Sequence, residues 1–177
     1  MTNRRVPILL SMVVTLSLLF GGWFLYQKVQ VENPIETKIG QMTSAKLNEI
    51  KVDKTHINVK LTVTKPDEFP EEYNELQQEI AKMVPDKEVD IAVTNQDGDL
   101  KDVWNNGLFA FTEAVELHQY SKIPAMLAEW KQVNKLDRAA SHMDDENIYV
   151  FLQRGDQQFY TVIPRQQSVD SEVILNG

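Results

Sequence analysis

The sequence contains no cysteine and little glycine or histidine, and each of these shortages excludes a kind of chemistry. Without cysteine the chain can form no disulfide, no thiolate metal site and no cysteine nucleophile. Its 7 glycines build no phosphate-binding loop. Its 3 histidines form no HxH or HxxxH pair, so the sequence contains no short-range zinc motif.

Acidic residues are absent from the first part of the chain, so the two parts of the sequence carry net charges of opposite sign. Arg4, Arg5 and Lys28 are the only charged side chains before Glu32, which gives residues 1–28 a charge of +3. The remaining residues carry 26 acidic and 15 basic side chains, a net charge of -11. A protein that binds the nucleic-acid backbone needs an excess of Lys and Arg. We therefore expect no nucleic-acid partner.

Residues 6–27 are predicted to form a transmembrane anchor. The first 21 of these residues are uncharged and 15 are apolar, and at about 1.5 Å per residue a helix of this length crosses a hydrocarbon core of about 30 Å. Trp23 and Tyr26 lie at the far end, where aromatic rings favour the headgroup layer. A cleaved signal sequence is the alternative, but its apolar core is shorter, and Gly21-Gly22 lacks the small residue that should precede a cleavage site.

The charges beside this anchor predict its orientation. Arg4 and Arg5 precede it, whereas Lys28 and Glu32 follow it. The excess of positive charge before the span favours residues 1–5 in the cytoplasm and the rest of the chain outside the cell membrane. The chain is thus expected to be a single-pass membrane protein with an acidic extracytoplasmic part.

The segment after the anchor is expected to be a stalk followed by one domain. Residues 28–50 are interpreted as a partly helical stalk, because Pro34 interrupts the helix and the apolar stripe that follows is narrow. Residues 51–164 are predicted to form a small extracytoplasmic α+β domain. Residues 165–177 are expected to be a flexible polar tail, although Val173-Ile174-Leu175 can dock.

Hydrophobic periodicity predicts a strand–helix–strand unit at the start of the domain. Residues 56–64 alternate between apolar and polar side chains without an error, which is typical of a strand with one buried face. A helix opens at Pro70 and stops at Pro85, and a second strand follows at 89–93. The connection is long enough for a parallel crossover, and an edge of this unit's sheet can accept a partner strand.

Two helices and a hairpin are predicted to complete the domain. One helix covers 99–120 and another follows Pro124 as far as His142, and their tryptophans suggest that this pair supplies most of the core. The segments 148–152 and 159–163 are predicted to pair as a hairpin. The expected order is β-α-β-α-α-β-β, an α+β fold with helices packed on one sheet of about four strands.

Three short motifs resemble binding sites, but local structure explains each of them better. His142 with Asp144-Asp145-Glu146 is the densest group of metal-ligand types, but a solvated turn explains it. The segment 95–99 resembles a calcium loop, yet Val93 and Trp104 occupy ligand positions. Arg154-Gly155-Asp156 matches the tripeptide that integrins read, but it is typical of a hairpin turn. We therefore assign no catalytic, cofactor-binding or metal-binding residue.

These observations favour a protein that acts by contact with other proteins. The expected function is that of a membrane-anchored component of envelope assembly or regulation, with a protein partner in the envelope and possible homo-oligomers. Neither GxSxG nor SxxK occurs, so enzymatic activity is not favoured. The alternatives are an anchored extracytoplasmic hydrolase, which would need convergent carboxylates or a perturbed His142, and a sensor of small ligands or cations.

Overall fold

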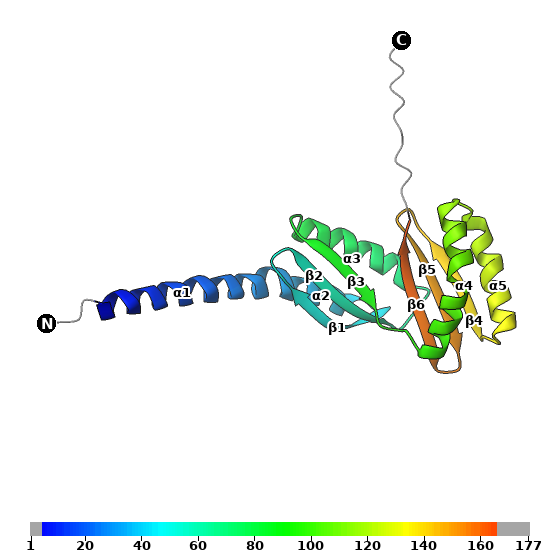
Figure 1. Cartoon of the computed structure of the whole chain (residues 1–177), viewed down its shortest axis with the longest axis horizontal. Coiled ribbons are helices and arrows are strands. Elements are labelled where there is room, and N and C mark those ends of the chain that lie inside the picture. Colours follow the sequence, from blue (N-terminus) through cyan, green and yellow to red (C-terminus); the bar gives the residue numbers. More distant parts are fainter. Residues whose placement is uncertain (1–4, 166–177) are drawn as a thin grey trace, which may run out of the picture.

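The computed structural model describes residues 5–165, in which a long helix leads into an α+β domain (Figure 1). The α+β class predicted from the sequence is confirmed, but the strands form two three-stranded sheets and not one sheet of about four. The remaining residues, 1–4 and 166–177, hold most of the predicted cytoplasmic terminus and polar tail, and both lie outside the described part of the chain.

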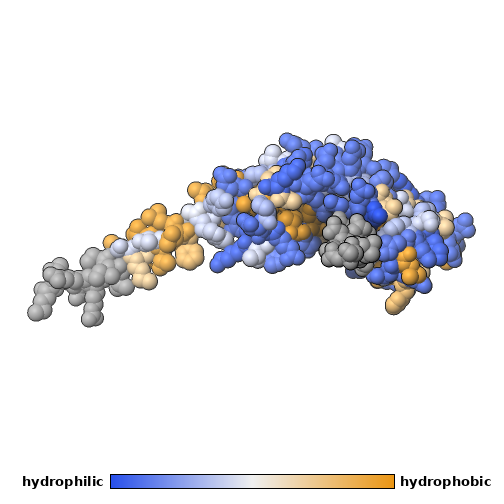
Figure 2. All heavy atoms as spheres, turned by 90° about the horizontal axis from the view of Figure 1, so that it is seen from above, coloured by the Kyte–Doolittle hydropathy of each residue, from blue (hydrophilic) through white to orange (hydrophobic). Residues whose placement is uncertain are grey.

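The N-terminal helix continues without a break into the domain. Helix α1 (Arg5–Gln27) is followed by the π-helical turn η1 (Lys28–Glu32) and then by α2 (Asn33–Gln41). By length and composition this helix can cross a membrane. Its side chains from Leu10 to Tyr26 are exposed and form the apolar arm in Figure 2.

Pro34 was expected to interrupt this helix, but the wide turn before it accommodates the proline. The N–H of Asn33 bonds to the carbonyl of Lys28, five residues back, and Pro34 then lies in the first turn of α2, where its missing N–H costs little. Residues 28–50 therefore differ from the expected stalk. They contain α2 and most of the first strand, and they bury Val31, Ile35 and Ile39 at helical spacing.

The first sheet has the order β1-β2-β3, with β1 (Ala45–Val52) antiparallel to β2 (His56–Val63) and β2 parallel to β3 (Glu88–Val93). Helix α3 (Phe69–Met83) makes the predicted crossover between the parallel strands. The apolar residues of β2 are at most 2% exposed, as the alternation predicts. The sequence does not predict β1, because a bulge between Leu47 and Glu49 breaks the alternation of buried and exposed side chains along this strand.

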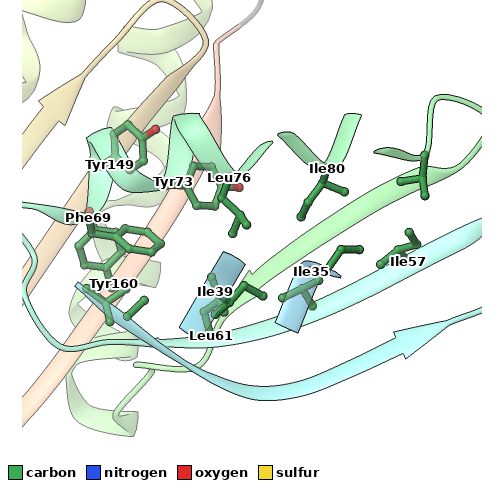
Figure 3. Packing of buried hydrophobic residues seen from close by; sticks show 14 of the residues in the cluster. Ile35, Ile39, Ile57, Leu61, Phe69, Tyr73, Leu76, Ile80, Tyr149 and Tyr160 are labelled. Carbon is green, nitrogen blue, oxygen red and sulfur yellow. The ribbon is translucent and has the colours of Figure 1, made fainter. Parts of the chain in front are cut away.

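Helices α2 and α3 cover one face of this sheet and enclose the first core cluster (Figure 3). Ile35 of α2 and Ile80 of α3 both pack toward Ile57 and Leu61 of β2. Tyr149 and Tyr160, which come from the second sheet, close the end of the same cluster. The two sheets therefore belong to one packed unit.

The second sheet has the order β4-β5-β6 and is antiparallel throughout. Its strands are β4 (Arg138–Met143), β5 (Asn147–Arg154) and β6 (Gln157–Pro164), so the predicted hairpin is present and β5 is an interior strand. The helices α4 (Gly98–Glu116) and α5 (Ile123–Val133) precede it, with a short 3-10 turn, η2 (Tyr120–Lys122), between them.

Helix α5 ends earlier than the sequence suggests. It stops at Val133, and Lys135, at φ 52, turns the chain into β4. His142 therefore lies on a strand and not near the end of a helix. The segment Arg138–Met143 contains no β-branched or aromatic residue, so the sequence carries no strand signal there.

The second sheet separates two core clusters. One face, with Ile148, Val150 and Leu152, packs against Leu100 and Phe111 of α4 and their neighbours on α5. The other face packs against α3, where the ring of Tyr160 meets that of Phe69 edge-on at 5.2 Å. The α4–α5 pair was expected to supply most of the core, but it supplies one of these two clusters.

Candidate functional site

The three histidines lie on separate elements and do not converge. His56 begins β2 and pairs with Glu88 at 3.0 Å, His118 follows α4, and His142 lies on β4. All three are exposed. Within residues 5–165 no group of three His, Asp or Glu side chains is arranged to hold a metal ion.

Asp144, the centre of the acidic cluster beside His142, stabilises a turn. Its Oδ1 accepts hydrogen bonds from the backbone N–H groups of Glu146 at 2.8 Å and Asn147 at 2.6 Å, and its Oδ2 accepts one from the Tyr149 hydroxyl at 2.7 Å. Burial raises the pKa of Asp144, but these bonds outweigh it and lower the pKa overall. Burial and the bond to Asp144 both raise the pKa of Tyr149. Neither group is thus prepared to exchange a proton near neutral pH.

The other two motifs are also used by the fold. Asn95 bonds to both the N–H and the carbonyl of Val63, and Asp97 accepts the N–H of Gln158 at 2.6 Å, so segment 95–97 joins the two sheets. In the Arg154-Gly155-Asp156 segment, Gly155 has φ 56 and forms the turn between β5 and β6. Asn95, Asp97 and Gly155 therefore each contribute to the contacts and turns of the fold itself.

The feature that stands out is the open edge of β4. This strand pairs with β5 on one side only. The N–H of Asp144 bonds to the carbonyl of Asn147, so by the alternation of an antiparallel ladder Ala139, Ser141 and Met143 direct their backbone groups away from β5. Among residues 5–165 no hydrogen bond to those outward groups is found.

A hollow lies on each face of the sheet beside this edge. The larger, of about 370 Å³, lies between β4 and the start of α5 and is bordered by Ile123, Pro124, Met143 and Ile148. The smaller, of about 100 Å³, lies on the face toward α3. Ser141 lines both hollows and Ala140 lines the smaller one, and these small side chains leave the hollows unfilled.

The two hollows differ in chemistry. The larger is mainly apolar, but the hydroxyl of Tyr120 is buried there without a hydrogen-bond partner, and the guanidinium of Arg165 lies 5.0 Å from the Tyr120 ring centroid. The smaller is polar at its rim, where Arg138 pairs with Asp67 and lies 5.4 Å over the Phe151 ring. An added strand, whose side chains alternate between the two faces, would meet an apolar space on one face and a polar rim on the other.

A third hollow, of about 340 Å³, lies beside β3 and the end of α3. It fits an added strand less well, because Glu88 and Asp90 place charges along β3 and because segment 95–97 already joins the continuation of β3 to β6. The edge of β4 is therefore the best candidate site. The sequence does not predict this edge, because His142 is expected near the end of a helix, although the turn residues 144–147 before a predicted strand are typical of a hairpin.

The chain matches no protein-family model, no curated protein and no solved structure. Its class is therefore defined by its fold and its site: a long apolar helix continuous with an α+β domain that has an open edge strand between two hollows.

Proposed function

We propose that this protein is anchored in the cell membrane by α1, with its domain outside, and acts by protein–protein contact in envelope assembly or regulation. The observation that carries the proposal is the open edge of β4, which has unpaired backbone groups and a hollow on each face. The apolar helix α1, which can cross a membrane, supports the anchoring.

The partner expected at β4 is an extended segment with an apolar side chain at every second position. Its backbone would bond to Ala139, Ser141 and Met143, and its apolar side chains would enter the larger hollow beside Ile148. Polar side chains on its other face would meet the rim that carries Arg138. Main-chain bonds would supply affinity, and the two hollows would supply specificity.

The described residues do not favour the alternative of a hydrolase. His142 borders both hollows, but Asp144 on the adjoining turn is held by its own hydrogen bonds, and Asp67, which lines the smaller hollow, is paired with Arg138. A general acid–base pair needs both groups within hydrogen-bond reach of one substrate atom. The contact function thus remains the proposal.

Site-specific crosslinking tests the contact directly. A photo-crosslinking residue in place of Met143, which is 45% exposed at the edge, should form an adduct in intact cells, and mass spectrometry should map the joined residue to an extended segment. An adduct with twice the mass of the chain would identify that segment as part of a second copy. The same residue in place of Asp156, in the exposed turn between β5 and β6, should give no such adduct.

The Ser141→Pro variant distinguishes a partner strand that pairs with the backbone of β4 from a partner that only lies near it. It removes an outward N–H without touching the ladder to β5, and proline is tolerated at such edge positions. The adduct from position 143 should disappear in this variant and persist in Ser141→Ala, while far-UV circular dichroism stays unchanged in both. An adduct that survives Ser141→Pro in a folded protein would contradict strand addition, as would the absence of any adduct from position 143.

A further inference from the structure

The domain begins at the residue where the apolar span ends. Tyr26 is 64% exposed, whereas Gln27 is only 8% exposed and its side-chain amide donates to the carbonyls of Val52 at 2.5 Å and Asp53 at 3.4 Å. Val31, one turn further along, is 5% exposed in the first core cluster. No spacer therefore separates the span from the folded domain.

This connection fixes how far one end of the domain can lie from the hydrocarbon core of the membrane. The headgroup layer is about 5–7 Å thick on each side of the hydrocarbon core, which is close to one helical turn. Residues bonded to Gln27 must then lie within that layer when α1 crosses the membrane. These residues are the turn between β1 and β2, and both that turn and the α3–β3 turn lie at the end of the domain from which α1 emerges (Figure 1).

The two turns are joined into one surface. The ammonium of Lys87 donates to the carbonyls of Asp53 and Lys54, and the N–H of Glu88 donates to the carbonyl of Thr55 at 2.8 Å. Segment 53–55 and residues 85–86 are exposed. We call residues 53–55 and 85–87 the membrane-proximal surface.

The membrane-proximal surface carries less negative charge than the domain as a whole, and it therefore suits a headgroup layer better. Lys54 and Lys87 balance Asp53 and Asp86, whereas residues 29–177 together carry a net charge of -11. Within residues 5–165 the ammonium of Lys54 has no bonding partner, so it can meet a phosphate. A surface without net negative charge lets an otherwise acidic domain lie against lipid phosphates.

We propose that the membrane-proximal surface rests in the lipid headgroup layer, where Lys54 binds a headgroup phosphate. The proposal rests on the anchoring proposed above. The domain then does not swing on a stalk. It lies directly on the membrane, with the β4 edge held in the part of the molecule farther from α1 (Figure 1).

The absence of cysteine makes the contact measurable with single labels on the full chain. The chain is reconstituted into vesicles of phosphatidylcholine and phosphatidylglycerol that contain a lipid with a nitroxide on its headgroup. A fluorophore on Thr55→Cys should be quenched several-fold more than one on Asp156→Cys, which lies in the turn between β5 and β6. Equal quenching at the two positions, in protein that floats with the vesicles, would overturn the proposal.

Two further variants test the geometry and the charge. A seven-residue helical insertion of Glu, Ala and Lys between Tyr26 and Gln27 moves the domain about 10 Å away from the membrane, and its nearly two full turns leave the same side of the domain facing the lipid. It should abolish the excess quenching while the protein still floats with the vesicles. Lys54→Glu should reduce the quenching at position 55, whereas Lys101→Glu, on the exposed surface of α4, should not. Quenching that survives the insertion would overturn the proposal. If the unmodified chain fails to float, the anchoring itself is wrong.

Discussion

Gly107 shows how a single residue determines the packing of α4 against α5. A Cβ built at this position would lie 1.9 Å from Cζ2 of Trp130, whereas Gly40, also helical, has no such neighbour within 4 Å. The indole of Trp130 meets that of Trp104 edge-on at 6.1 Å, so the glycine allows two large rings to pack between the helices. The two glycines therefore make a matched pair of substitutions.

Gly107→Ala should lower the free energy of unfolding by about 1–3 kcal/mol, because the indole must move away from its aromatic neighbours. Gly40→Ala should leave it unchanged or raise it by about 1 kcal/mol, since alanine is the better helix former. Denaturant unfolding of the full chain in micelles, followed by tryptophan fluorescence, measures both. Equal stabilities for the two variants would contradict the packing of Trp130 on α4.

Glu72 makes a second residue-scale contribution, at the junction of α2 and β1. Its carboxylate accepts bonds from the N–H groups of Thr43 and Ser44 and from both hydroxyls. Burial raises the pKa of Glu72, but these bonds outweigh it and hold the pKa below its usual 4.5. Because the folded pKa lies below the unfolded value, the stabilisation is complete above about pH 4.5 and is lost as the pH falls through the folded pKa.

Glu72→Gln should therefore cost about 1 kcal/mol at pH 7, a modest value because the side chain is only half-buried and solvent screens it in part, and should cost less as the pH falls below 4.5. Urea unfolding at pH 7 and pH 3.5 measures this difference. Glu71→Gln, on an exposed neighbour, is the control and should have little effect at either pH. A cost for Glu72→Gln that grows with acidification would contradict the assigned role.

At the scale of elements, the sequence predicts the helices and strands that depend on neighbouring residues. It does not predict the strands that depend on contacts with distant residues. The alternation of β2 and the proline-bounded helix α3 depend on neighbouring residues, so the sequence alone indicated them. The bulged β1 and the alanine-rich β4 are strands because other strands pair with them. The open edge at β4 depends on that pairing, which is why the candidate site was not predictable.

Helix α2 distinguishes a stalk from a core element. Ile35→Ala should lower the free energy of unfolding by about 2–5 kcal/mol, because Ile35 is 0% exposed and its truncation leaves a cavity between α2 and β2. Thr37→Ala, exposed on the same helix, should cost less than about 1 kcal/mol. Chemical unfolding of the full chain compares the two. A small effect for Ile35→Ala would show that this segment is a free stalk after all.

At the scale of the whole molecule, a helix apolar enough to cross a membrane leads directly into the domain, and the second sheet of that domain has an open strand edge. We propose that the domain lies outside the cell, because the basic residues Arg4 and Arg5 precede the apolar helix. A membrane-impermeant maleimide should label Asp156→Cys in intact cells and should label Thr2→Cys only after the cells are opened. Labelling of Thr2→Cys in intact cells would reverse the predicted orientation.

We propose that α1 stays attached to the domain and holds it on the membrane. The most direct test is the intact mass of the protein recovered from carbonate-washed membranes. If α1 stays attached, the protein in the membrane fraction should have a mass of 20.4 kDa. A soluble product that begins after the apolar residues of α1 would contradict it, because the domain would then have been released from the helix that positions it.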